Sequence, residues 1–338
     1  MKAENPVPVK LSQYQPPLHS VREVFLTFTL DFNDTLVQNR MVIVTENPEQ
    51  EIKLNGEELN LIAISVDGNR LNDDDFEVGE DELVIKPVGK KEFVLEIENR
   101  INPAANKALD GLYKSGDIFC TQNEAEGFRR ITYYFDRPDV MAVFTTKIIA
   151  DKKEFPILLS NGNLIDSGDV DSKRHFCTWH DPHPKPCYLY ALVAGDLGMI
   201  EDTYTTQSGR KVDLQIFCDK GNENKCHHAM TSLKKSMKWD EDTFGLEYDL
   251  DIYMIVAVDS FNMGAMENKG LNIFNSAYVL ADQETATDND FMPKPQTPNP
   301  KPQTPNPNPK PQTPNPKKIY WKINKYKKNK KKWKKQKN

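Results

Sequence analysis

Features typical of secreted and membrane proteins are missing from this sequence. No run of apolar residues approaches the roughly 18 that a membrane-spanning helix needs. The opening MKAENPVPV also lacks the basic region and following apolar region of a secretory leader. Cysteine is scarce, because the 338 residues include only five, an odd number at wide spacings. These absences predict a cytoplasmic protein with reduced thiols and no membrane span.

Acidic residues are absent from one end of the chain. From Pro293 onward the sequence has fifteen lysines, no arginine and no Asp or Glu. Residues 1–292 instead hold 29 basic and 50 acidic residues, a net charge of −21. Repeats such as PKPQTPNP fill residues 293–316, and proline at this frequency does not sustain helices or sheet ladders. We expect a proline-rich linker there, followed by a disordered lysine-rich tail at residues 317–338.

The first half of the chain has mainly β signals. Apolar and polar residues alternate in LTFTL (26–30), and MVIVTE, DELVIKPVG and EFVLEIEN are β-rich runs bounded by turn residues. The expected fold class is mainly β, then α+β. An antiparallel β-sandwich domain is predicted at residues 1–194.

A second domain is predicted at residues 195–292. Met230, Leu233 and Met237 recur at helical spacing and predict a helix that ends near Gly245. The apolar run IYMIVAV (252–258) predicts a strand that is covered on both faces.

The stretch FNMGAMENKG (261–270) follows this run and suggests a peptide-binding site. A pocket that takes a peptide's ammonium group from water must surround it with carboxylates. Glu267 in this stretch and Glu124 in TQNEAEG are the candidates. Gly264 has no side chain, so a peptide backbone can approach it and add as a strand. Without other information, a glycine and two methionines near a strand end more often indicate packing.

With this stretch the chain resembles the aminopeptidase N family, in particular the bacterial cytosolic alanyl aminopeptidases. The G-A-M-E-N motif carries the resemblance together with TQNEAEGFRRITYYFDRPDV, DPHPKPCYLYALVAGDLG and MKWDEDTFGLEYDLDIYMIVAVDSFN, in the family's order. The likeness covers about residues 10–292. It implies an N-terminal β domain, the sheet part of a thermolysin-like catalytic domain, and zinc-dependent release of N-terminal amino acids of the alanine type.

The resemblance also implies the substrate-binding residues. In the family both glutamates hold the substrate amine, a glutamine lies beside it, and a methionine cushions the first side chain. The matching residues here are Gln122, Glu124, Met263, Gly264, Ala265, Met266, Glu267 and Asn268.

The zinc motif of the family, H-E-x-x-H with a further Glu, is absent from the sequence. Without it nothing holds the zinc that activates water. We therefore expect a truncated, inactive aminopeptidase with no catalytic residue and no bound zinc, whose strand at 252–258 is exposed by the loss of covering helices. Cys177, His180, His183 and Cys187 have suitable ligand types, but their proline-rich stretch is interpreted as a loop and no zinc site is expected there.

Other functions stay open. The chain is alternatively a module that binds peptide N-termini, or half of a split aminopeptidase completed by a separate catalytic polypeptide. A further alternative is that the basic tail, with its Tyr and Trp residues, binds nucleic acid or an anionic membrane. Because the acidic body repels polyanions, no specific nucleic-acid partner is expected. Two charge-assisted contacts of ~1.5–3 kcal/mol each total roughly 3–6 kcal/mol before the cost of association. A millimolar complex already needs about 4 kcal/mol, so peptide binding is expected to be weak.

Overall fold

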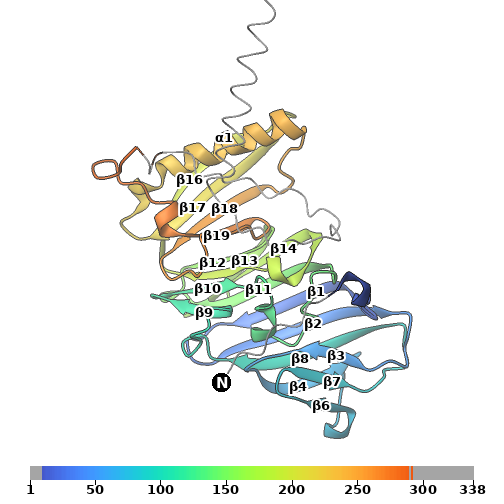
Figure 1. Cartoon of the computed structure of the whole chain (residues 1–338). Coiled ribbons are helices and arrows are strands. Elements are labelled where there is room, and N and C mark those ends of the chain that lie inside the picture. The colour runs from blue at the N-terminus through green and yellow to red at the C-terminus, as the bar shows by residue number, and fades with distance from the viewer. Residues whose placement is uncertain (1–9, 289–290, 292–338) are drawn as a thin grey trace, which may run out of the picture. The chain divides into compact units, whose positions relative to one another are not determined.

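The computed structural model describes residues 10–288 and 291, so the predicted linker and tail lie outside the described residues. The described part contains four β-sheets and a single α-helix (Figure 1). This confirms the predicted fold class. The division into domains at residues 194 and 195 stays a prediction. No helix in the described part has both the length and the apolar character that crossing a bilayer requires.

The largest sheet has eight strands. They are β1 (His19–Thr29), β2 (Thr35–Thr45), β4 (Asn60–Val66), β5 (Asn69–Arg70), β8 (Glu92–Ile101), β11 (Ala142–Asp151), β13 (Asn163–Asp169) and β14 (Arg174–Lys185). Their order is β13-β14-β11-β1-β2-β8-β4-β5. Strands β8 and β11 alternate strictly between more and less buried residues, because one face of the sheet packs on the core. The sheet is mixed, since β1 and β11 run parallel while its other pairs are antiparallel.

Two smaller sheets complete the N-terminal part. One contains β3 (Ile52–Asn55), β6 (Phe76–Val78) and β7 (Glu82–Ile85), and the other contains β9 (Gly111–Ser115), β10 (Ile118–Gln122), β12 (Ile157–Ser160) and β15 (Leu192–Gly195). Short 3-10 helices lie at η1 (Leu11–Gln13), η2 (Asp73–Asp75), η3 (Phe128–Arg130), η4 (Cys187–Leu189), η5 (Glu223–Lys225) and η6 (Ser276–Tyr278).

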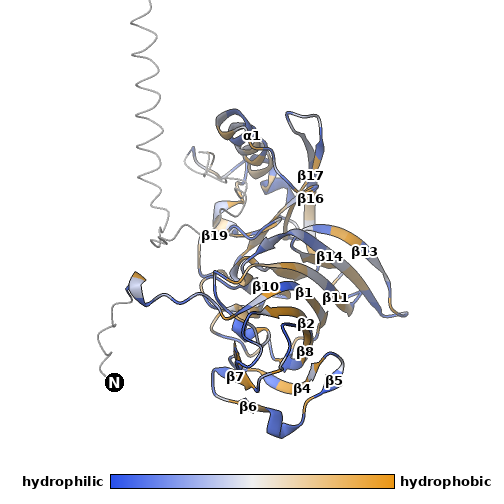
Figure 2. Ribbon diagram, turned by 90° about the vertical axis from the view of Figure 1, so that its right-hand side faces the viewer, coloured by the Kyte–Doolittle hydropathy of each residue, from blue (hydrophilic) through white to orange (hydrophobic). Residues whose placement is uncertain are grey.

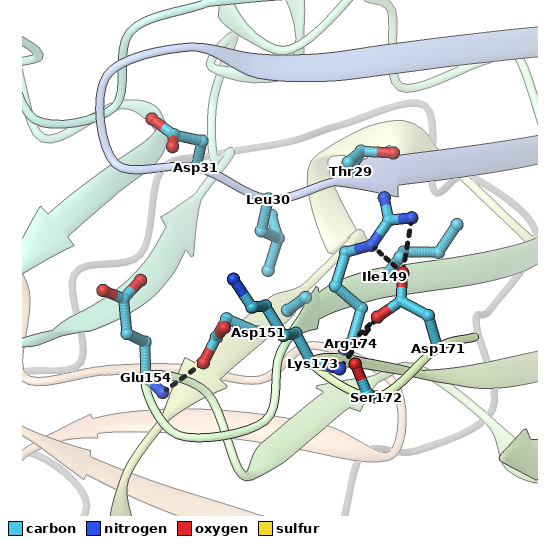
Figure 3. A pocket seen from close by; sticks show the side chains of 11 residues that line it. Thr29, Leu30, Asp31, Ile149, Asp151, Glu154, Asp171, Ser172, Lys173 and Arg174 are labelled. Carbon is cyan, nitrogen blue, oxygen red and sulfur yellow. Dashed lines mark hydrogen bonds and ion pairs between the residues drawn. The ribbon is translucent and has the colours of Figure 1, made fainter. Parts of the chain in front are cut away.

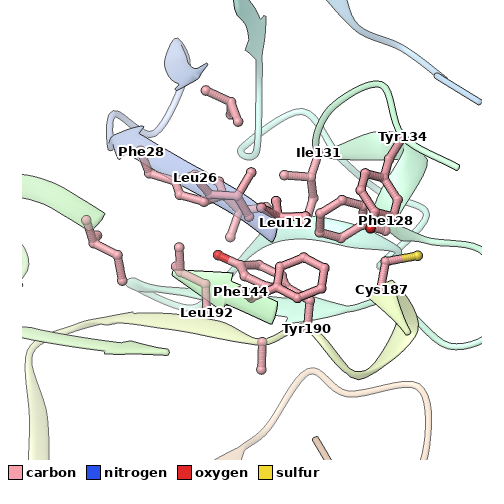
Figure 4. Packing of buried hydrophobic residues seen from close by; sticks show 14 of the residues in the cluster. Leu26, Phe28, Leu112, Phe128, Ile131, Tyr134, Phe144, Cys187, Tyr190 and Leu192 are labelled. Carbon is pink, nitrogen blue, oxygen red and sulfur yellow. The ribbon is translucent and has the colours of Figure 1, made fainter. Parts of the chain in front are cut away.

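Aromatic rings from distant segments fill the core between these sheets (Figure 4). Phe128 is fully buried, and its ring meets those of Tyr134 and Tyr190 edge to face at centroid distances of 5.1 and 5.3 Å. Phe144 packs against the same ring at 6.1 Å. Edge-to-face pairs of this kind add to the stabilisation from burial alone. The core therefore fixes the start of η3, directly after the loop of residues 123–127.

A five-stranded sheet with one helix forms the C-terminal part of the described chain. Its elements are β16 (Leu197–Thr205), β17 (Lys211–Asp219), α1 (His227–Phe244), β18 (Ile252–Val258), β19 (Ala265–Met266) and β20 (Leu271–Asn275), with the strand order β16-β17-β18-β20-β19. Helix α1 lies along one face of this sheet (Figures 1 and 2). It ends at Gly245, whose left-handed φ of 65° caps the helix, as predicted.

Strand β18 is covered on both faces, which confirms one prediction and corrects another. Tyr253 and Ile255 belong to the cluster packed under α1, whereas Met254 and Val256 belong to the core of the N-terminal sheets. All four are at most 1% exposed. The expected exposure of this strand was wrong, because the N-terminal part itself packs against the second face of the sheet.

The proline-rich stretch at 177–187 was interpreted as a loop, and this was wrong. Most of it lies in β14, which pairs with β11 on one side and β13 on the other. The pairing with β13 ends at His180, so Pro182 and Pro184 lie beyond it and both are exposed. A proline there removes no hydrogen bond to that neighbour, which explains why the strand tolerates both.

Candidate functional site

The first candidate segment is the loop that joins β10 to η3. Gln122 Nε2 donates to the backbone oxygen of Glu124 at 3.1 Å, and Gly127 N donates to the Asn123 oxygen at 2.9 Å. A Cβ on Gly127 would lie 2.5 Å from the Gln122 oxygen, so only glycine fits where the loop closes. The closed loop holds Glu124 at the surface, with its carboxyl group partly covered.

The second candidate segment contains the G-A-M-E-N residues around β19. Ala265 and Met266 pair with β20, and Asn275 N donates to the Gly264 oxygen at 3.0 Å. Met266 is buried, and Met263 packs against the main core. Strand β19 is the edge of its sheet, and among the described residues no strand pairs with its outer side. This placement is compatible with the predicted strand addition by a peptide.

Gly264 has a structural reason of its own to lack a side chain. A Cβ there would lie 3.3 Å from Cε2 of Tyr278, a half-exposed ring in η6. A contact of 3.3 Å is tighter than most Cβ contacts, so an added side chain would require the Tyr278 ring to move by a few tenths of an ångström. The missing side chain therefore has a local packing reason, and the approach of a peptide backbone to Gly264 stays a prediction.

The fold brings Glu124 and Glu267 close enough to interact, although one follows β10 and the other follows β19. Partial burial raises the pKa of the Glu124 carboxyl group, and the charge of Glu267 raises it further. Tyr188, the middle residue of η4, is affected by the same two charges. Burial raises the pKa of its hydroxyl, and the charges of Glu124 and Glu267 raise it further. We call Glu124 and Glu267 the carboxylate pair. Two neighbouring carboxylates repel each other and together attract a cation.

Two amide side chains beside the carboxylate pair keep unused hydrogen-bonding atoms. Oε1 of Gln122 and Nδ2 of Asn268 are buried and have no hydrogen-bond partner in the described part of the chain. Both residues are at most 3% exposed. Buried polar atoms are normally paired, so these two lack, within the described residues, the partner that such atoms usually have.

Tyr188 is the residue that the sequence did not single out. It lies within the segment KPCYLYALV, where no spacing or charge distinguishes it from neighbouring core aromatics. The charges of both carboxylates raise the pKa of its hydroxyl, an effect that depends on the folded structure and not on the local sequence.

Zinc, which the family resemblance implies, does not fit the residues that are present. Among residues 10–288 and 291, no group of three or more His, Cys, Asp or Glu side chains is placed to hold a metal ion. The alternative ligands have other partners: His180 Nδ1 meets Thr145 Oγ1 at 2.9 Å, His183 faces Asp249, and Cys187 Sγ donates to Asp136. All five cysteines are described and none forms a disulfide.

A pocket of about 500 Å³ lies elsewhere, between the ends of β1 and β11 and the turn from β13 to β14 (Figure 3). Two of its carboxylates accept hydrogen bonds from their own turns. Asp171 Oδ1 accepts from the backbone of Lys173 and Arg174, and these bonds lower the pKa of Asp171 to about 2. Asp151 Oδ1 likewise accepts from the following turn. We therefore interpret this pocket as a junction of capped turns.

Comparison with known proteins supports the resemblance seen in the sequence. Residues 13–189 match the Peptidase M1 N-terminal domain, and residues 228–293 match the Peptidase family M1 domain. Aminopeptidase N of Escherichia coli K12 is 56% identical over 283 residues, which are 82% of this chain and 32% of that protein. Aminopeptidase N of Haemophilus influenzae is 51% identical over 280 residues, with the same coverage of 82% and 32%.

A solved structure shows the same fold. The crystal structure of Legionella pneumophila aminopeptidase A in complex with aspartic acid matches with a TM-score of 0.79 and 35% identity, over 84% of this chain and 34% of that one. The chain thus spans about a third of the length of these relatives. The domain matches cover more than half of its residues, and the chain belongs to peptidase family M1.

Proposed function

We propose that this chain binds the free N-terminal amine of peptides through the carboxylate pair, as the amine-recognising part of an M1 aminopeptidase. The observation that carries the proposal is that the charge of Glu267 raises the pKa of Glu124, although the two residues follow strands of different sheets. An ammonium group between them would relieve their mutual repulsion. Peptide binding then follows from chemistry that the described residues provide.

The proposed function is peptide binding without hydrolysis. The sequence has no H-E-x-x-H, and the described residues do not fit a metal. We propose that the chain alone does not hydrolyse peptides. The split-enzyme alternative needs a second polypeptide that carries the zinc motif, and no observation on the described residues favours it. The lysine-rich tail lies outside those residues, so its nucleic-acid or membrane role also stays a prediction.

Titration of the chain with alanyl-alanine amide tests the proposal. We expect a dissociation constant of about 1 mM or weaker, because two charge-assisted contacts leave little after the cost of association. The same peptide with an acetylated N-terminus is expected not to bind, since it carries no ammonium group. Chemical-shift changes in NMR spectra measure both affinities.

Matched variants show whether the carboxylate pair is responsible. Glu124→Gln with Glu267→Gln is expected to abolish binding of the free peptide. Glu126→Gln is the control, because Glu126 is an exposed carboxylate in the same loop that pairs with Arg129 at 3.4 Å. Equal binding of the acetylated peptide, or unchanged binding by the double variant, would contradict the proposal.

The pH dependence of peptide affinity is a separate prediction. Affinity is expected to rise as the pH increases through the pKa of Glu124, which lies above its usual value of 4.5, because only the ionised carboxylate attracts ammonium. It is expected to fall again above about pH 8, where the peptide amine loses its proton. Glu267→Gln removes one cause of the raised pKa, so the acidic midpoint is expected to move down. Titrations at several pH values measure this, and a wild-type midpoint at or below 4.5 would be inconsistent with the site.

A further inference from the structure

Asn161 connects the G-A-M-E-N segment to the N-terminal part of the chain. It lies in the turn between β12 and β13 and is 3% exposed. Its Nδ2 donates to the Lys269 oxygen at 2.8 Å and to the Leu189 oxygen at 3.0 Å, while its Oδ1 accepts from Ala191 N at 2.7 Å. One side chain thus ties the residue two places after Glu267 to the backbone at 189–191.

Lys269 is fixed from its other end by a buried charge. Its Nζ makes an ion pair and hydrogen bond with Asp249, and the side chain is 1% exposed. The next residue, Gly270, packs so closely that an added Cβ would lie 3.1 Å from the nitrogen of Gly162, beside Asn161. The end of the G-A-M-E-N segment is therefore held by backbone, side chain and close packing together.

The Glu124 loop is tied to the same stretch of backbone, residues 189–192, which we call the anchor segment. Asn123 Nδ2 donates to the Tyr190 oxygen at 2.7 Å. Thr121 Oγ1 accepts from Leu192 N at 2.9 Å. Asn123 is fully buried and Thr121 is 1% exposed, so both bonds are shielded from water.

We propose that Asn161 is a positioning residue. Its side chain bonds both Lys269 and the anchor segment, and so holds Glu267 at a fixed position relative to Glu124. This inference rests on the proposed function, since it concerns the geometry of the carboxylate pair. Glu124 directly follows Asn123, which bonds the anchor segment, and Glu267 lies two residues before Lys269, which Asn161 links to that segment. The anchor segment therefore sets the separation of the two carboxylates. Asn161 supplies the link that crosses to the second sheet.

Replacing Asn161 by aspartate tests the proposal with almost no change in shape. The carboxylate keeps the acceptor for Ala191 N but loses both bonds from Nδ2. In the full chain carrying ¹³C-methyl methionine, Asn161→Asp is expected to shift the signals of Met263 and Met266, which flank Gly264 and Glu267. It is also expected to weaken binding of alanyl-alanine amide about tenfold. Met41, buried in β2, is the internal reference signal.

Asn99→Asp is the matched control. Asn99 is also fully buried, and its Nδ2 donates at 3.0 Å to the oxygen of Ile131, a residue of neither the anchor segment nor the G-A-M-E-N segment. Both variants are expected to lower the melting temperature, but only Asn161→Asp is expected to move the Met266 signal and the affinity. A folded Asn161→Asp variant with an unmoved Met266 signal would overturn the proposal.

A second variant keeps the proposal testable if Asn161→Asp does not fold. Asp249→Asn with Lys269→Gln neutralises both members of the ion pair together, which avoids an unpaired buried charge. It is expected to shift the Met266 signal as well, and an unmoved signal would count against the positioning role. If the wild-type chain binds no alanyl peptide at all, the proposed function fails, whereas the Met266 shift still decides the role of Asn161.

Discussion

Replacing Lys185 by methionine is expected to lower the free energy of unfolding by about 3–5 kcal/mol. Lys185 in β14 is 1% exposed, and its Nζ lies 3.2 Å from Oδ2 of Asp181, which is completely buried. The ammonium group also lies 4.2 Å from the ring centroid of Phe144. Burial lowers the pKa of Lys185 and the charge of Asp181 opposes this change. Without Lys185, Asp181 would be a buried charge with no counter-ion, which is the costly state.

Urea unfolding of three variants measures this effect. Asp181→Leu with Lys185→Met removes both charges and is expected to recover most of the lost stability, because the pair contributes little beyond compensating its own burial. Lys238→Met is the control, since Lys238 and Asp242 form an exposed pair on α1 and a loss within about 0.5 kcal/mol is expected. If Lys185→Met lost less than about 1 kcal/mol, Asp181 would have another partner.

Gly127→Ala is expected to cost about 3 kcal/mol and to remove peptide binding, because it opens the Glu124 loop. The added Cβ would lie 2.5 Å from the Gln122 oxygen and 2.9 Å from both Asn123 Cα and Gly111 N. All three are backbone atoms, so no side-chain rotation relieves the contact. Gly127 has a φ of −86°, which alanine adopts readily, so the cost is steric and not conformational.

Gly168→Ala is the comparison for this prediction. Gly168 in the edge strand β13 has only the Phe176 ring as a neighbour, at 3.4 Å, so alanine is expected to be tolerated. Thermal unfolding and peptide titration together separate the two effects. Normal stability and normal binding in Gly127→Ala would show that the loop closes differently from the structure described.

The secondary structure of the C-terminal part was predictable because its signals are local. The spacing of Met230, Leu233 and Met237 follows the helical period, and Gly245 supplies the left-handed cap. The seven-residue run at 252–258 has only apolar side chains, as a strand buried on both faces requires. Period and capping act over a few residues, so the sequence expresses them directly.

The segment at 177–187 could not be predicted in this way. Prolines normally exclude a strand, and Pro182 and Pro184 pointed to a loop. Whether a proline is tolerated depends on which neighbour its missing N–H would have faced. That neighbour, β13, ends its pairing at His180, a fact set by the sheet and absent from the local pattern.

The sequence alone determined the family resemblance, the predicted substrate-binding residues and the absence of H-E-x-x-H. Only the tertiary structure decided that Glu124 and Glu267 share one electrostatic environment, that Tyr188 joins them, and that Asn161 spans the two sheets. The physical reason is the distance along the chain between the residues that interact. Motifs and periodicity arise from neighbours along the chain, whereas a pKa shift or a buried hydrogen bond arises from neighbours in space that the packing of whole sheets brings together.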